Sequence, residues 1–220
     1  MRVLAACLLI LAIPTSIAVA GANYGCGLFI DFTGTAEDWD DVLAGDNAIY
    51  PQIGESFDVY VGLVYDRVAL VWNGQGYEWG AGGDLEVHSV AFGLEFDALT
   101  AQYVSMESLL PSGDVFTFPD HNYLVYTWGC EVAPVVYVAR FTFYFTYAPG
   151  DIFLVEHSNY GREVADCTPP DGLVDEYCIA NSAGIGQLPT GGEAGCDPFY
   201  DNPVEFRTWG SIKALYRSGR

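Results

Sequence analysis

The sequence predicts an all-β protein, an antiparallel β-sandwich. The segment 135–147 (VVYVARFTFYFTY) alternates with a period of two and consists almost entirely of β-branched and aromatic residues, which suit a pleated strand. About eight to ten such segments follow one another with turn residues between them. No long helical pattern interrupts them, which favours two packed sheets over a mixed fold.

We expect the segment 135–147 to be the strand around which the sandwich is organised. One of its faces carries Val135, Tyr137, Ala139, Phe141, Phe143, Phe145 and Tyr147. A face of this size needs a second sheet to cover it. At about 3.3 Å per residue the segment would span roughly 43 Å, so we also expect a bend or bulge within it.

Shorter alternating segments lie before and after this strand. Those before it are 28–33, 57–65, 68–72, 87–96, 102–106 and 123–128, and those after it are 152–155, 163–165 and 177–180. In 87–96 we place His88 on the apolar face, together with Val90 and Phe92. Pro111, Gly113 and Pro119 indicate a loop between the strands 102–106 and 123–128.

The start of the chain predicts a secretory signal peptide at residues 1–20. Arg2 is followed by an apolar run, and Ala18-Val19-Ala20 provides the small-residue cleavage pattern. The alternative is an uncleaved anchor, but the apolar run is shorter than the roughly 20 residues that a membrane span needs. We therefore predict a secreted, extracellular or cell-surface protein, with the periplasm as a further alternative, and no membrane span after cleavage.

Three further regions complete the predicted organisation. The sandwich domain covers residues 21–180, and residues 181–203, rich in Gly, Pro and polar residues, form a loop or linker. Residues 204–220 form a basic C-terminal element, and its candidate recognition residues are Arg207, Trp209, Lys213 and Arg217. Its apolar residues fall at helical spacing, although a final strand is the alternative. The element could equally pack onto the sandwich.

Composition limits the partners that we expect. The chain of 220 residues has 29 acidic and 8 basic residues and a formal net charge of −21. Such a charge argues against nucleic acid and against anionic membranes. It favours a cation or a basic partner, and the alternative is simply a well-solvated surface.

Cysteines indicate disulfide bonds rather than a metal centre. Export permits disulfides, and Cys167 and Cys178, which bracket a turn-rich segment, are the candidate pair. Cys26, Cys130 and Cys196 remain, and which of them is paired stays open. No C-x-x-C motif occurs and the three histidines are far apart, so we expect no zinc site.

Three segments resemble one family. FDVYVGL (57–63), SVAFGLEFD (89–97) and FTFYFTYAPGDIFL (141–154) are similar, in order and pattern, to strands of cohesin-type modules and related carbohydrate-binding modules. The resemblance implies a jelly-roll sandwich. The ending TWGSIKALYR (208–217) resembles that of exported bacterial proteins that carry such sandwiches. The inserted loop 66–85 and the cysteine-bearing segment after Asp166 depart from a compact cohesin, which puts dockerin-type binding in doubt.

An acidic loop before the second predicted strand is a candidate calcium site. Its carboxylates are those of Asp38, Asp40, Asp41 and Asp46. Calcium takes six to eight oxygen ligands, and clustered carboxylates can supply several of them. The spacing is not that of an EF-hand, and the alternative is a solvated loop or a short helical turn. We expect no other cofactor.

A glycine-rich loop is flanked or occupied by Trp72, Tyr77 and Trp79, which are candidates for carbohydrate binding. Exposed aromatic rings offer flat faces on which sugar rings stack. The same residues could cap the core instead, because aromatic side chains bury large areas.

No catalytic motif occurs in the chain. There is neither a G-x-S-x-G elbow nor a phosphate-binding loop, and the many acids single out no carboxylate pair. The sequence therefore favours a non-catalytic module that binds a protein partner outside the cell or at its surface. A module that binds extracellular polysaccharide is the alternative, and a secreted glycoside hydrolase is a second one.

Overall fold

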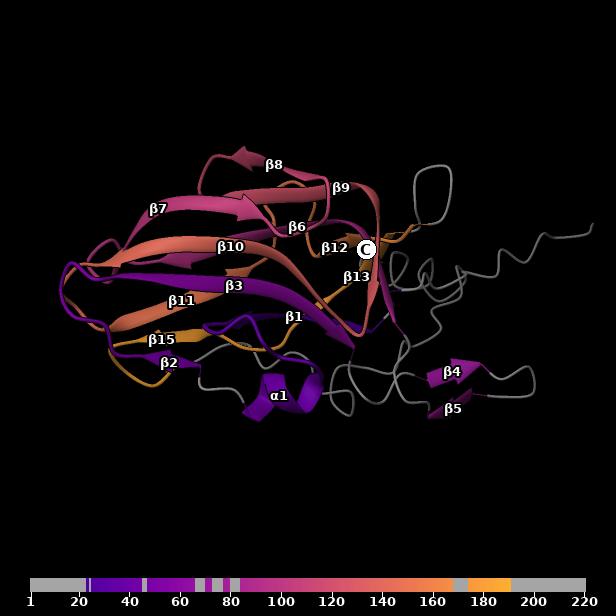
Figure 1. Cartoon of the computed structure of the whole chain (residues 1–220), viewed down its shortest axis with the longest axis horizontal. Helices are drawn as coiled ribbons and strands as arrows, with labels where there is room; N and C mark the ends of the chain where they lie inside the picture. Colours follow the sequence, from indigo (N-terminus) through magenta and orange to yellow (C-terminus); the bar gives the residue numbers. More distant parts are fainter. Residues whose placement is uncertain are drawn as a thin grey trace, which may run out of the picture.

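A computed structural model describes residues 23, 25–44, 47–65, 70–72, 77–79, 84–167 and 174–190. These residues form a two-layer β-sandwich with one short helix, as Figure 1 shows, so the predicted all-β sandwich is confirmed. Among the residues described, no helix has the length and apolar character needed to cross a membrane. The predicted signal peptide and the predicted basic element at 204–220 lie outside these residues.

The first sheet has five strands. In spatial order they are β14 (Cys178–Ile179), β1 (Cys26–Asp31), β3 (Ser56–Tyr65), β10 (Val135–Phe145) and β7 (Ala101–Ser108). All neighbours are antiparallel except β1 and β14, which run parallel. Asn181 extends that parallel edge, because its side-chain amide accepts from the N–H of Ile30 and donates to the carbonyl of Ile30.

Strand β10 lies between β3 and β7 and contains the expected bulge, between Tyr137 and Ala139. Phe141 and Phe143 are fully buried, as predicted. Before the bulge the faces are exchanged, because Val136 and Val138 are the buried residues there. The prediction that Tyr137 shares the core face of Phe141 is therefore wrong. Its hydroxyl instead donates to the Asp31 carboxylate at 2.6 Å.

The second sheet has eight strands. Its main path is β13 (Val174–Glu176), β12 (Glu163–Ala165), β6 (Leu85–Phe96), β11 (Gly150–Val155), β15 (Ala183–Ile185) and β2 (Ala48–Ile49), while β9 (Asn122–Ala133) pairs with β6 and with β8 (Gly113–Phe118). Two of these strands lie in segments predicted as loops. Strand β8 occupies the region between Pro111 and Pro119, and β15 extends the sandwich into 181–203.

The two sheets enclose an aromatic core. Phe92 and Tyr123 from the eight-stranded sheet contact the ring of Phe141 from the five-stranded sheet edge to face, at centroid distances of 6.1 and 4.9 Å. Phe143 continues this layer by stacking on Phe57, at 5.8 Å. Fully buried aromatic side chains contribute roughly 1.5–3 kcal/mol each by burial, so this layer holds the sheets together.

Helix α1 (Trp39–Ala44) covers the outer side of the five-stranded sheet, where Trp39 and Val42 pack on Phe29. A capping arrangement starts the helix. The Asp38 carboxylate accepts from the N–H of Asp41 at 3.0 Å, and the Asp41 carboxylate accepts from the N–H of Glu37 at 3.0 Å. The first bond satisfies an amide that a helix start leaves without a partner, and the second ties the residue before the N-cap to the first turn.

A large irregularity between β6 and β9 shapes the outer face of the second sheet. Val87 pairs with Glu131 and Ser89 pairs with Tyr126, so residues 127–130 of β9 face the single residue His88. Val87 and Val90 are both fully buried as a result. The prediction that His88 lies on the apolar face is wrong, because its ring is turned outward with Nδ1 3.2 Å from the Gly129 carbonyl.

Candidate functional site

The outer face of the eight-stranded sheet carries three aromatic rings in contact, which we call the aromatic patch: Phe116 of β8 with Tyr126 and Trp128 of β9. Phe116 and Tyr126 stack at 5.3 Å, and Tyr126 meets Trp128 edge to face, also at 5.3 Å. Trp128 is 79% exposed and Phe116 is 54% exposed. Large aromatic side chains contribute most when buried, so a patch that stays exposed suggests a surface for contact with another molecule.

The strand register explains why these rings point outward. Tyr123 and Val125 of β9 are buried in the core, so the alternate residues Leu124 and Tyr126 face outward. Thr127 points inward again, and its hydroxyl donates to the Pro111 carbonyl. Trp128 therefore projects outward, and because β8 begins at Gly113, opposite Thr127, no residue of β8 lies beside it.

A groove of about 200 Å³ lies on the same face. Small residues form its floor, namely Ser89 and Ala91 of β6 and Ala165 of β12, while Tyr160 and Val174 stand at its sides. The register pairs Ser89 with Tyr126 of the aromatic patch on one side and with Ala165 on the other. The groove and the patch are therefore parts of one continuous surface.

The charge on this surface is negative. Glu86, Asp114, Glu163 and Glu176 lie on strands of the sheet, and the eight strands as bounded above contain no Lys or Arg. Glu163 and Glu176 stand directly opposite each other in the register of β12 and β13. Like charges in that position repel one another, which a cationic group bound between them would relieve.

His157 holds the turn that presents Tyr160 to the groove. Its ring is 1% exposed, and Nδ1 accepts from the N–H groups of Asn159 at 3.0 Å and Tyr160 at 3.3 Å. Because Nδ1 accepts, the proton of the neutral ring is on Nε2. Burial lowers the pKa of His157, which favours this neutral form.

A second, polar cavity of about 390 Å³ lies between β1 and α1. Asp31 lines it and accepts from the Tyr137 hydroxyl at 2.6 Å and from the N–H of Thr33 at 2.8 Å. Partial burial opposes ionisation, but these hydrogen bonds outweigh it and hold the pKa of Asp31 below its usual value. The bonds tie together the loop that leads to α1, so Asp31 has a structural role there.

The predicted calcium ligands are partly used for another purpose. The carboxylates of Asp38 and Asp41 cap α1, as described above. Within the described residues, Asp38, Asp40 and Asp41 do not form a group with metal-ligand spacing; the group that does is Glu86, Cys130 and Cys167. Asp46 lies outside the described residues, so calcium binding by this loop stays a prediction.

The candidate disulfide between Cys167 and Cys178 is wrong. Cys167 is bonded to Cys130, across a Cα–Cα distance of 5.7 Å, and Cys178 belongs to another disulfide. Cys130 lies on β9 and Cys167 follows β12, so the bond ties together two of the strands that pair with β6. Cys26 is a free, buried thiol whose pKa is raised by burial.

The candidate carbohydrate-binding aromatics lie on a separate two-stranded sheet, formed by β4 (Leu70–Trp72) and β5 (Tyr77–Trp79). The register pairs Trp72 with Tyr77 and Leu70 with Trp79, so the hairpin brings the three candidate positions close together along the chain's backbone. The candidate recognition residues Arg207, Trp209, Lys213 and Arg217 lie outside the described residues.

Sequence reasoning missed the aromatic patch. The available indication was the alternation of Tyr126 and Trp128 with the buried Tyr123 and Val125, together with Phe116 in the segment GDVFTF. In the sequence, however, Pro111, Gly113 and Pro119 indicate a loop at this segment. Without β8 as a strand, Phe116 could not be placed on the same face as Tyr126.

No protein-family model and no curated protein matches the chain. Among solved structures it is similar to the cohesin module of a family 33 glycoside hydrolase from Clostridium perfringens, at 14% identity over 73% of this chain and 96% of that one, with a TM-score of 0.48. The seventh ScaB type I cohesin from Pseudobacteroides cellulosolvens gives 10% identity over 76% and 95%, with a TM-score of 0.46. A non-cellulosomal cohesin from the archaeon Archaeoglobus fulgidus gives 9% over 73% and 88%, with a TM-score of 0.41.

These likenesses concern the fold alone. All three neighbours are described as cohesin modules.

Proposed function

We propose that the chain is a non-catalytic protein-binding module, which acts outside the cell or at its surface, and that the outer face of the eight-stranded sheet is its binding surface. The observation that carries this proposal is the aromatic patch, three rings in contact beside a groove on an exposed sheet face. Tyr and Trp are enriched among the residues that dominate protein–protein binding energies. Trp128, the most exposed of the three rings, is the anchor of the surface.

Charge and shape define the partner. It presents a short apolar segment that covers Trp128 and Phe116, with Lys or Arg on either side. The basic residues face Glu86 and Asp114, whose strands contain no Lys or Arg. Complementary charge of this kind mainly raises the association rate and selects the partner, while the apolar contact supplies most of the affinity.

The composition of the surface favours a protein over a glycan. The polar residues nearest to the rings are Ser89 and Asp114, which both lie opposite Tyr126. Leu124 lies opposite Phe116 in the register of β8 and β9, and Val174 lies at the side of the groove, so aliphatic side chains accompany the rings. Such aliphatic residues are suited to contact with apolar side chains of a protein.

Selection from a phage-displayed random peptide library on the immobilised full chain tests the proposal. We expect enrichment of peptides with apolar residues flanked by Lys or Arg. Trp128→Ala should weaken their binding by about 2 kcal/mol or more, as expected for a central aromatic anchor. Tyr144→Ala is the matched control, because Tyr144 is an exposed aromatic residue on β10, in the other sheet.

Two results would contradict the proposal. One is the enrichment of peptides whose binding is unchanged in Trp128→Ala. The other is the enrichment of acidic peptides, which the negative surface should repel.

A second candidate function is carbohydrate binding by Trp72, Tyr77 and Trp79. The specific observation in its favour is the register of β4 and β5, in which Trp72 pairs with Tyr77 and Trp79 lies two residues further along the same strand as Tyr77. A glycan array probed with the wild type and with Trp79→Ala tests it. If the wild type binds no glycan, this candidate is discarded.

A further inference from the structure

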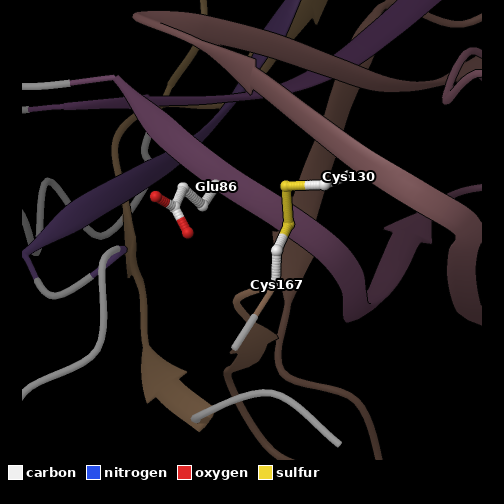
Figure 2. A group of neighbouring side chains, drawn as sticks. All are labelled: Glu86, Cys130 and Cys167. Carbon is white, nitrogen blue, oxygen red and sulfur yellow. A yellow bond between two sulfur atoms is a disulfide. The ribbon is translucent and has the colours of Figure 1, made fainter. Parts of the chain in front are cut away.

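Three side chains with metal-ligand chemistry meet at the edge of the outer face: the Glu86 carboxylate and the sulfurs of the Cys130–Cys167 disulfide. One ligand atom from each lies within 4.8 Å of the others. Figure 2 shows the carboxylate beside the disulfide, with the three residues coming from separate segments of the chain. In the part of the chain that the structure describes, this group alone has such spacing.

The backbone holds all three residues in place without help from a metal. Glu86 is fixed by Asn23, whose side-chain amide donates to the Glu86 carbonyl at 2.7 Å and accepts from its N–H at 2.9 Å. Cys130 lies in the bulged part of β9, and Cys167 follows β12 directly. Cys130 is exposed, so a small reductant in solution can reach this side of the bond.

We propose that reduction of the Cys130–Cys167 disulfide by a small dithiol turns this group into a binding site for a soft divalent cation such as Zn²⁺. The dithiol is oxidised to its own disulfide, and the protein S–S bond takes up two electrons and two protons to give two thiols. Binding of the cation releases those two protons, and two thiolates and the Glu86 carboxylate become its ligands. Water takes the fourth position, as in zinc sites with three protein ligands.

The dimensions of the site suit zinc. With Zn–S bonds of about 2.3 Å, two sulfurs on a tetrahedral zinc lie roughly 3.8 Å apart. Rotation of the two side chains can supply this separation from the observed Cα–Cα distance of 5.7 Å. Two thiolates beside a carboxylate repel one another, so the dithiol form gains from a bound cation.

The site differs in chemistry from the predicted calcium loop. Thiolate ligands select soft or borderline metals such as zinc, whereas calcium takes oxygen ligands only. The proposal shares Glu86 with the binding surface proposed above, but its test reads metal binding and does not involve Trp128.

Cobalt is the probe for the experiment. The full chain is reduced with a dithiol, freed of it under anaerobic conditions and titrated with Co²⁺, and Zn²⁺ is then added in competition. We expect one equivalent of Co²⁺ to give thiolate-to-cobalt charge-transfer absorption, which Zn²⁺ abolishes. The oxidised chain should give none.

Variants assign the ligands. Glu86→Gln should weaken Co²⁺ binding by at least about tenfold, since even the loss of an outer partner of a metal ligand costs that much. Glu95→Gln, an exposed glutamate on the same strand, should leave binding unchanged. The double variant Cys130→Ser/Cys167→Ser should not bind, although it retains the Cys26 thiol and, after reduction of the disulfide to which Cys178 belongs, that of Cys178.

The proposal is overturned if the reduced wild type does not bind Co²⁺, or if either Glu86→Gln or the double variant binds it as the wild type does. Circular dichroism of the reduced wild type and of the double variant shows whether each keeps the β-sandwich. An unfolded reduced chain would bind through its thiols without regard to Glu86, so equal affinities in that case also count against the site.

Discussion

Phe116 and Tyr126 stack across β8 and β9 with their ring planes 15° apart, although neither ring belongs to the core. Among the described strands β8 pairs with β9 and with no other, so this stack helps to hold β8 on β9. We expect Phe116→Ala to lower the free energy of unfolding by about 0.5–1.5 kcal/mol, the contribution of an aromatic pair. Trp128→Ala should change it by less than about 0.5 kcal/mol, because the side chain is largely in solvent. Urea unfolding of both variants measures the difference, and a larger effect for Trp128 would contradict it.

Truncation of a buried core residue should cost far more stability than truncation of the exposed Trp128. Phe141 is fully buried against Phe92 and Tyr123, so Phe141→Ala leaves a cavity between the two sheets. We expect a loss of about 3–5 kcal/mol in the free energy of unfolding. Tyr144→Ala, on the solvent side of the same strand, should cost less than about 1 kcal/mol. Equal losses in urea unfolding would mean that β10 does not face the core as described.

Two glycines near the aromatic patch should respond differently to one added methyl group. At Gly113 a Cβ would lie 2.6 Å from the Tyr126 carbonyl oxygen and 2.8 Å from that of Leu110. Both are backbone atoms, so the start of β8 must move, and Gly113→Ala should cost about 1–3 kcal/mol. At Gly129 the nearest atom is 3.9 Å away, and Gly129→Ala should be neutral within about 0.5 kcal/mol. Thermal unfolding compares them, and equal melting temperatures would contradict this account of β8.

Acid should weaken the turn that carries Tyr160. The folded-state pKa of His157 is lowered by burial, so below the ordinary histidine value of about 6.5 the unfolded chain binds more protons than the folded one. The stability that neutral His157 contributes is therefore complete above about pH 6.5 and is lost as the pH falls through the lowered pKa of the folded state. His157→Asn keeps an acceptor for the turn but does not titrate, so it should flatten the fall of stability between about pH 7 and 5.

His121→Asn is the control for this pH dependence. His121 is exposed and has a positive φ of 55°, which asparagine tolerates well. We expect its pH profile in urea unfolding to match that of the wild type. If His157→Asn also keeps the wild-type profile, the turn is not the source of the acid sensitivity.

The disulfide should stabilise the fold by closing a loop. Cys130 and Cys167 are 37 residues apart, and cross-linking a loop of that length restricts the unfolded chain by roughly 4 kcal/mol. Oxidised Cys130→Ser/Cys167→Ser should lose about this amount relative to the oxidised wild type in urea unfolding. The addition of a dithiol should lower the stability of the wild type at least as far, because it also reduces the disulfide to which Cys178 belongs. A double variant as stable as the oxidised wild type would contradict the prediction.

The sequence was most informative where the residue pattern and the burial agree. Phe141, Phe143 and Phe145 alternate without interruption, and their period of two was enough to predict the central strand and its buried face. The two sheets followed from the number of such segments. The expected bulge in β10 was also found, but its position could not be read, because Val136 and Val138 are as apolar as the residues of the opposite face.

The outer face was beyond prediction for a related reason. The alternation of apolar and polar residues does not reveal the extra residues of β9 opposite His88. These residues nevertheless determine where His88 and Cys130 lie. Cys167 pairs with Cys130 because β12 and β9 both border β6, which is a property of the sheet order and not of sequence distance. Residues brought together by topology alone, such as Glu86 and the disulfide, share no motif.

The placement of β14 and β15 has a consequence for how the protein is made. These two short strands come last among those described, yet one borders β1 at the edge of the first sheet and the other lies between β11 and β2 in the second. A nascent chain cannot close either layer until residues 178–185 have been synthesised. We therefore expect both sheets to be completed only late in the elongation of the chain.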